Sequence, residues 1–151
     1  MLTKIYKFVK LPYEQKRLFV EAFVTLGVMK RAIDTSSFKD ITKSYKHHKG
    51  YKKHDIITTD DKEIAILIGK IIQQAANHTP WQSACLVQSL TLMRMLRKRG
   101  IPAMFYLGVN KRDEMKAHAW SVYGDEILTG KDGYEKFTVV SSIEMILGEI
   151  E

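Results

Sequence analysis

The chain has 151 residues, a length that suits one domain with its own hydrophobic core. A hydrophobic fraction of 45% and a charged fraction of 27% are those of an ordinary soluble globular protein, and the formal net charge at pH 7 is +7. The single cysteine excludes an internal disulfide and a multi-cysteine metal site, and it fits a reducing compartment.

The sequence carries no membrane-spanning or targeting pattern. No run of residues approaches the roughly 18 uninterrupted apolar positions that a membrane-spanning helix needs. The lysines that follow Met1 are not succeeded by the apolar segment of a signal peptide. We therefore expect a cytoplasmic protein without a membrane partner.

The first helix is predicted from Tyr13 to about Ile33, where apolar residues recur at helical spacing after a proline that fits a first helical turn. Residues 34–58 are polar and basic, and we expect a long surface loop or a weakly structured segment there. The positive charge concentrates in residues 39–53, which hold six lysines. Such a segment suits nucleic acid, an acidic peptide or protein, or plain solvation, and charge alone does not separate these.

Two more helices are predicted in the middle of the chain. The Thr and Asp residues at 58–61 offer an N-cap for a helix of about residues 62–77, which has an apolar stripe. Thr79-Pro80 predicts the start of the next helix, with Ser83 as a later alternative. That helix runs to about Arg99 and ends at Gly100.

After this helix the hydrophobic period changes to that of strands. Four strands are predicted at 103–109, 117–123, 127–131 and 136–141, followed by a short terminal helix at 143–150. Helices first and an antiparallel sheet afterwards indicate an α+β fold. We expect a single domain over residues 1–151, in which a helical and basic-loop part (1–59) precedes the core (60–142).

Cys85 lies near the predicted start of the third helix. Unpaired N–H groups and the positive end of the helix dipole favour the thiolate, which is the nucleophilic form of cysteine. The alternative is an inert core residue, because free cysteine is among the most buried residue types. The position alone does not decide between the two.

His118, on the second predicted strand, is the candidate base for this thiol. An imidazole beside a thiol can take its proton and later protonate the leaving amine, whereas an isolated histidine on a half-buried strand needs no such role. A third group should orient the ring. If the turn after Tyr123 has three residues, the register pairs His118 with Asp132; a two-residue turn would place Lys131 there instead.

Further candidates surround this pair. The backbone N–H of Cys85, with the side chain of Gln82 or Gln88, is a candidate oxyanion hole, although each glutamine also suits an ordinary polar helix position. Trp81 and Trp120 are candidates for positioning the substrate. The histidines in the basic segment, His47, His48 and His54, lack acidic or thiol partners at ligand spacing, so we expect a surface role and no metal or other cofactor.

The residues around the pair match a known family. Trp81-Gln82-Ser83-Ala84-Cys85-Leu86 opens a Leu/Arg-rich helix, Leu107-Gly108-Val109 ends a strand, and Ala117-His118-Ala119-Trp120 follows. The order and spacing of these motifs over about residues 60–142 resemble the lasso-peptide leader peptidases, which are transglutaminase-like B-type maturation proteases.

The resemblance implies a transglutaminase-like, papain-related fold in which Cys85 is the nucleophile and His118 the general base and acid. The implied activity is cleavage of a ribosomally made precursor at the junction of leader and core. The family's acid lies on the strand after the histidine, where Gly130 stands in this chain, so Asp132 requires a small shift.

The resemblance also implies partners. The residues ahead of the second helix do not have the pattern of a strand-rich recognition domain, so a stand-alone peptidase working with a separate leader-binding protein is implied. A cyclase that closes the macrolactam on the released core is a further implied partner, and residues 39–53 could dock a partner or the precursor. Two other functions remain open: a transglutaminase-type acyl transferase using the same Cys–His pair, and a non-enzymatic basic module that binds protein or nucleic acid. We do not expect nucleic acid as the partner.

Overall fold

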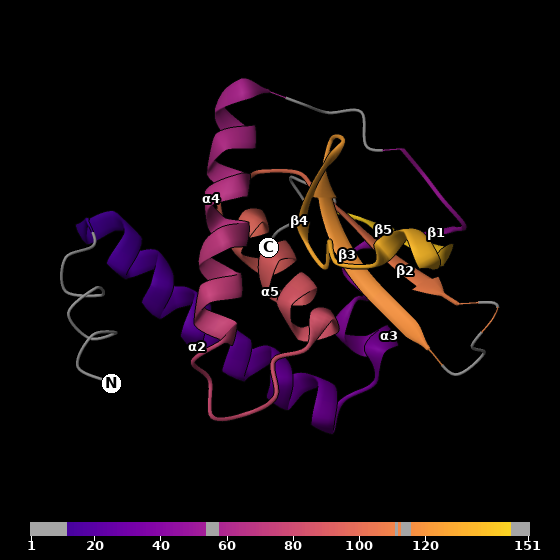
Figure 1. Cartoon of the computed structure of the whole chain (residues 1–151), viewed down its shortest axis with the longest axis horizontal. Coiled ribbons are helices and arrows are strands. Elements are labelled where there is room, and N and C mark those ends of the chain that lie inside the picture. Colours follow the sequence, from indigo (N-terminus) through magenta and orange to yellow (C-terminus); the bar gives the residue numbers. More distant parts are fainter. Residues whose placement is uncertain (1–11, 54–57, 111, 113–115, 146–151) are drawn as a thin grey trace.

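The computed structural model describes residues 12–53, 58–110, 112 and 116–145 (Figure 1). Helices come first in the chain and most of the sheet follows, as the sequence predicts. The elements are α2 (Tyr13–Thr35), α3 (Phe38–Ile41), β1 (Lys46–Lys49), α4 (Thr59–Ala76), α5 (Cys85–Lys98), β2 (Met104–Val109), β3 (Ala117–Tyr123), β4 (Glu126–Thr129), η1 (Tyr134–Lys136) and β5 (Thr138–Glu144).

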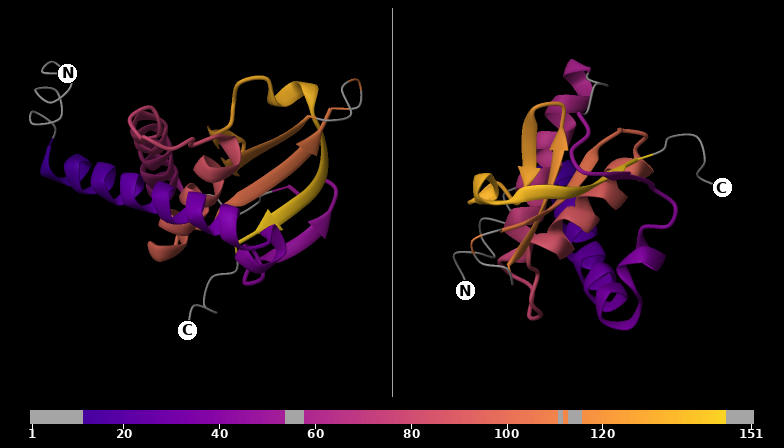
Figure 2. Two further views of the ribbon diagram at one scale, coloured as in Figure 1. Left: turned by 90° about the horizontal axis from the view of Figure 1, so that it is seen from below. Right: turned by 90° about the vertical axis from the view of Figure 1, so that its right-hand side faces the viewer.

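The strands form one antiparallel sheet in the order β1-β5-β2-β3-β4. Helices α2, α4 and α5 gather on one side of this sheet, and α5 packs along β3 (Figures 1 and 2). The α+β fold class is therefore confirmed. None of the described helices is long and apolar enough to cross a membrane.

The main core lies between the helices and the sheet. In α4, the residues Ala65, Ile68, Ile72 and Ala75 are completely buried, as their helical spacing predicts. Helix α4 begins where the sequence indicates, because the side chain of Thr58 accepts a hydrogen bond from the backbone N–H of Asp61. Helix α2 contributes Ala22, Leu26 and Met29 to the same core.

A smaller apolar cluster covers the opposite face of the sheet. It consists of Met104 and Tyr106 of β2 with Trp120 and Val122 of β3, which are all buried. The segment from η1 into β5 packs against it through Tyr134, Phe137 and Val139. Side chains of β3 thus alternate between the helix side and this second cluster.

Three predictions about the elements were wrong. The basic segment is not a continuous loop: it contains α3 and the edge strand β1, whose polar residues pair with β5. Helix α5 begins at Cys85, two residues after the alternative start at Ser83, and not at Thr79-Pro80. The hydroxyl of Thr79 instead bonds to the carbonyls of Ala76 and Trp81 and so forms a turn. Ile143 and Glu144 belong to β5, the N–H of Met145 donates to the carbonyl of Ala103, and residues 146–150 lie outside the described residues.

Candidate active site

Cys85 is the first residue of α5, and its side chain is half-buried. The N-cap residue, Ala84, has no side chain that can accept a hydrogen bond, and the first turn of α5 contains no acidic residue. The positive end of the helix therefore has no capping anion of its own among these residues. A negatively charged sulfur at this position would be stabilised by the first-turn N–H groups.

The loop before Cys85 is fastened to α2. The Trp81 ring packs against Phe23 at 5.3 Å between ring centroids, and a Cβ on Gly27 would lie only 3.1 Å from it. The Ser83 hydroxyl lies 2.9 Å from that of Thr79. The predicted positioning residue Trp81 thus has an evident packing role, although its indole N–H is buried without a hydrogen-bond partner among the described residues.

His118 lies at the beginning of β3, opposite Gly108 of β2. Its Nε2 is 2.6 Å from the main-chain carbonyl oxygen of Gly130, and its ring lies against Trp120 and Phe137 at centroid distances of 5.7 and 5.0 Å. A carbonyl can only accept, so Nε2 carries the proton and the neutral ring has its basic lone pair on Nδ1. In this tautomer, Nδ1 is the nitrogen that can accept a proton.

Hydrogen bonds between α5 and the sheet locate the thiol. Ser89 lies one helical turn after Cys85. Its hydroxyl is 2.9 Å from the hydroxyl of Thr129, and its main-chain carbonyl accepts a hydrogen bond from the hydroxyl of Ser121. The next residue after Thr129 is Gly130, the partner of the histidine. The N-terminus of α5 and the imidazole are therefore at the same end of the sheet.

The thiol and the imidazole do not bond to each other in this structure. The alternation along β3 directs Ala119 and Ser121 to the helix side, where Cys85 packs, and His118 and Trp120 to the other. Both residues belong to the described part of the chain, and no hydrogen bond joins the sulfur to the ring there.

Asp132 does not orient the ring in this structure. The three-residue turn on which that prediction rested is wrong, since Tyr123 pairs with Glu126 across a two-residue turn. A bulge between Ser121 and Val122 then shifts the register so that Ser121 pairs with Thr129, as the predicted register requires. Strand β4 nevertheless ends at Thr129, before Asp132, which is exposed. Within the described chain, Asp132 takes part in no hydrogen bond or ion pair; the Gly130 carbonyl occupies the ring nitrogen instead.

The remaining predicted residues have other surroundings. Gln82 is exposed, and the Gln88 amide donates to the carbonyl of Ser83, so it supports the loop before the helix. Trp120 is buried and packs between Tyr106 and Tyr134. The oxyanion hole stays a prediction.

Sequence reasoning missed the Gly130 carbonyl, and one signal could have found it. The resemblance places an acid at this position, and the chain has glycine there. Gly130 has a φ of 74°, and a Cβ built on it would lie 2.3 Å from the carbonyl oxygen of Ala119. A residue in that conformation with no room for a side chain can contribute only its main chain.

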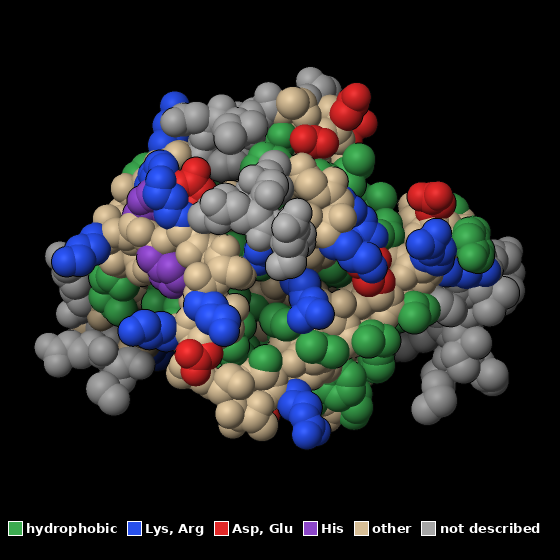
Figure 3. Space-filling view, turned by 180° about the vertical axis from the view of Figure 1, so that it is seen from behind, with side chains coloured by type: hydrophobic (Ala, Val, Ile, Leu, Met, Phe, Trp, Pro, Cys, Tyr) green, Lys and Arg blue, Asp and Glu red, His purple; other side chains and the backbone are tan. Residues whose placement is uncertain are grey.

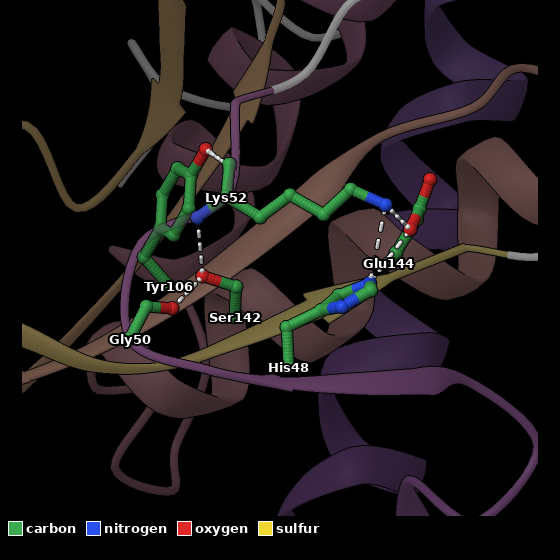
Figure 4. Close-up of polar contacts among 6 residues, drawn as sticks. All are labelled: His48, Gly50, Lys52, Tyr106, Ser142 and Glu144. Atoms are coloured by element: carbon green, nitrogen blue, oxygen red, sulfur yellow. Dashed lines mark hydrogen bonds and ion pairs between the residues drawn. The ribbon is translucent and has the colours of Figure 1, made fainter.

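The histidines of the basic segment serve the fold. His48 and Lys52 both contact the Glu144 carboxylate of β5, at 2.8 and 2.7 Å (Figure 4). The hydrogen bond from Lys52 is the main cause that lowers the pKa of Glu144, and His48 adds to it. His47 bonds to the carbonyl of Thr42, while His54 lies outside the described residues. In the described chain, no three His, Cys, Asp or Glu residues cluster as metal ligands.

Comparison with known proteins gives one match. The family model described as the transglutaminase-like superfamily matches residues 43–142, two-thirds of the chain. The chain belongs to the transglutaminase-like superfamily. That superfamily generally contains cysteine proteases and acyltransferases. In this superfamily member the matched region contains α4, α5, β1 to β4 and all but the last two residues of β5, and it excludes α2. Searches of curated proteins and of solved structures each found no match.

Proposed function

We propose that this protein is a cysteine peptidase that removes the leader peptide from a ribosomally made lasso-peptide precursor. The observation that carries the proposal is the arrangement at one end of the sheet. A half-buried thiol occupies the first position of α5, and the imidazole of His118 is held there through Nε2 by the Gly130 carbonyl. Membership of the transglutaminase-like superfamily supports cysteine chemistry at this position.

In the proposed reaction, Nδ1 of His118 takes the thiol proton of Cys85, and the sulfur attacks the carbonyl carbon at the leader–core junction. The tetrahedral oxyanion collapses, His118 protonates the leaving amine, and the core peptide departs with a free amino group. The leader remains as a thioester on Cys85. Water then attacks the thioester and gives a proton to His118, and the C–S bond breaks. The leader leaves as a carboxylic acid, and His118 returns the proton to the sulfur of Cys85.

This mechanism needs the sulfur within hydrogen-bond reach of Nδ1. The two groups make no such bond in the structure, and catalytic hydrogen bonds commonly tighten only when substrate is bound. Because His118 faces the side of the sheet opposite Cys85, the proposed reaction requires the ring to leave its contacts with Trp120 and Phe137 and turn toward the sulfur. The proposed partners are the precursor's leader region, a separate leader-binding protein and the lasso cyclase.

A transglutaminase-type acyl transfer is the second candidate, because both reactions pass through a thioester on Cys85. The two differ only in whether water or an amine attacks that thioester. Family membership favours neither of them.

Thiol alkylation tests the Cys–His pair without a substrate. Cys85 is the only cysteine, so iodoacetamide uptake reports on it alone. We expect the alkylation rate at neutral pH to fall about tenfold or more in His118→Ala, because the neighbouring base is lost. The control His47→Ala removes a histidine of β1 and should leave the rate unchanged. Equal rates in all three proteins would rule out the pair.

The reaction itself is tested with a precursor peptide and its leader-binding protein. We expect cleavage at the leader–core junction by the wild type and none by Cys85→Ala. Mass spectrometry of the leader product separates the candidates, since hydrolysis gives a free carboxylic acid and transfer gives an amide. Unaltered cleavage by Cys85→Ala would exclude both reactions.

A further inference from the structure

The outer face of α2 is apolar where a surface helix is normally polar. Val20, Val24 and Val28 are 53%, 58% and 44% exposed, and their spacing of four residues places them in one row along the helix. The opposite face of α2 is buried in the core through Ala22, Leu26 and Met29. Among the described residues, the valine row is therefore not part of the hydrophobic core.

The row borders a groove between α2 and α5, which we call the valine groove. Its volume is about 370 Å³. It is lined by Glu21, Val24, Thr25, Val28, Arg94, Met95 and Lys98. Viewed from behind, the molecule shows hydrophobic side chains in a diagonal band along α2 with lysine and arginine beside it (Figure 3).

The rim of the valine groove is positively charged. Arg17 and Arg31 are exposed on the same side of α2 as the valines, since they stand three residues from Val20 and Val28. Arg94 is exposed on the α5 side. The acidic residue of the groove, Glu21, is neutralised by Arg99 at 2.6 Å and by Lys98 at 3.8 Å.

We propose that the valine groove docks a helix of a partner protein, apolar along one side and flanked by Asp or Glu residues. An apolar strip with a cationic rim is complementary to such a helix in both respects. A second copy of this chain fits less well, because the net charge of +7 sets two basic rims against each other. A bilayer also fits less well, because interfacial helices insert Trp, Phe or Leu, and this row has short valines beside a concave groove.

The location separates this surface from the candidate active site. Arg94 and Lys98 lie two to four helical turns beyond Cys85 on α5, on the order of 14–20 Å along the helix axis. Helix α2 also lies outside the region that matches the superfamily. A helix in the valine groove would therefore leave Cys85 open, and the proposal stands whether or not the protein is a peptidase.

The test uses a fluorescein-labelled synthetic helix with leucines along one side and glutamates along both flanks. Fluorescence anisotropy with the full chain should give a dissociation constant in the micromolar range that weakens as salt is added. The variant Val20→Gln/Val24→Gln keeps helix-forming residues and should bind about tenfold or more weakly. Ile64→Gln, which changes an apolar residue 42% exposed on α4, should bind as the wild type does.

The charge requirement has its own controls. Arg94→Glu should weaken binding, whereas Lys70→Glu, an exposed position on α4, should not. A peptide with glutamine in place of each glutamate should bind more weakly to the wild type. Failure of the glutamate peptide to bind, or equal binding by the valine variant, would overturn the proposal.

Two further measurements distinguish the other occupants. Sedimentation equilibrium that shows a dimer abolished in the valine variant would assign the groove to a second copy. Binding to phosphatidylcholine–phosphatidylserine vesicles that the valine variant loses, without binding of the peptide, would assign it to a lipid surface. Either result would overturn the protein-helix proposal.

Discussion

The ring of His118 is oriented by a main-chain carbonyl, and this has consequences for its chemistry. The Gly130 oxygen at 2.6 Å fixes the tautomer and the ring direction as a carboxylate would. It carries only a partial charge, so it stabilises the imidazolium less than an ionised acid does. No side-chain substitution can delete this acceptor; it can only be displaced.

Displacing the carbonyl is the purpose of Gly130→Ala. Gly130 and Gly133 both have positive φ, which costs an alanine about 1–2 kcal/mol. A Cβ on Gly130 would in addition meet the Ala119 oxygen at 2.3 Å, whereas a Cβ on Gly133 meets nothing within 4 Å. We expect urea unfolding to show a larger loss for Gly130→Ala than for the control Gly133→Ala. Equal losses would mean that the backbone at Gly130 yields easily.

The two catalytic candidates were accessible from the sequence, whereas the ring's partner was signalled only by the glycine at position 130. Cys85 lies at a helix start and His118 on a strand, and both assignments depend on local pattern alone. Beyond a bulge in β3, Ser121 pairs with Thr129, which is the register that would set Asp132 opposite His118. Strand β4 ends at Thr129, however, and the ring bonds to the carbonyl of Gly130, a residue with positive φ. Counting along a strand does not show where the strand ends.

At the scale of the elements, a buried pair of hydroxyl groups connects α5, the helix that begins with Cys85, to β4 of the sheet. Ser89 of α5 and Thr129 of β4 are completely buried and 2.9 Å apart. Ser89→Ala should destabilise the fold by about 1–3 kcal/mol, because the Thr129 hydroxyl loses its partner. Thr129→Val should act similarly, and the double variant should cost less than the sum of the two. Chemical denaturation of the four proteins measures this coupling, and strict additivity would contradict it.

The edge strand β1 is held by an ionic cluster whose strength depends on pH. The pKa of Glu144 is lowered chiefly by the hydrogen bond from Lys52, so its contribution to stability exists above the ordinary pKa of a glutamate and disappears as pH falls through the lowered value. Glu144→Gln should therefore be less stable than the wild type at neutral pH, and the difference should vanish in acid. Thermal unfolding across pH measures it, with exposed Glu135→Gln as the control. A difference that persists at low pH would contradict the linkage.

The same strand shows where pattern reading fails for whole elements. Helices α2 and α4 bury one side each, and β3 buries apolar residues on both faces, so these elements are visible as apolar patterns in the sequence. Strand β1 has the sequence Lys-His-His-Lys and buries almost nothing, because it is an edge strand stabilised by pairing with β5. Lysines on an edge strand also discourage pairing with other chains. An element held by backbone pairing and polar side-chain contacts has no hydrophobic period to detect.

At the scale of the whole molecule, the residues that match the superfamily and the residues that form the main core are not the same set. The match begins at residue 43, after α2 has ended. Yet α2 supplies Ala22, Leu26 and Met29 to the main core and holds the loop before Cys85 through Phe23. Helix α2 should therefore belong to the same folding unit as the matched region.

Truncating one buried side chain of α2 tests this unity. Leu26 is completely buried, so Leu26→Ala should lower the free energy of unfolding by about 2–5 kcal/mol and shift a single transition that involves the whole chain. Val24→Ala, two residues away and 58% exposed, should change it by no more than about 0.5 kcal/mol. Circular dichroism and tryptophan fluorescence should report the same midpoint, since Trp81 lies against α2 and Trp120 beyond the sheet. Separate midpoints would show that α2 unfolds independently of the matched region.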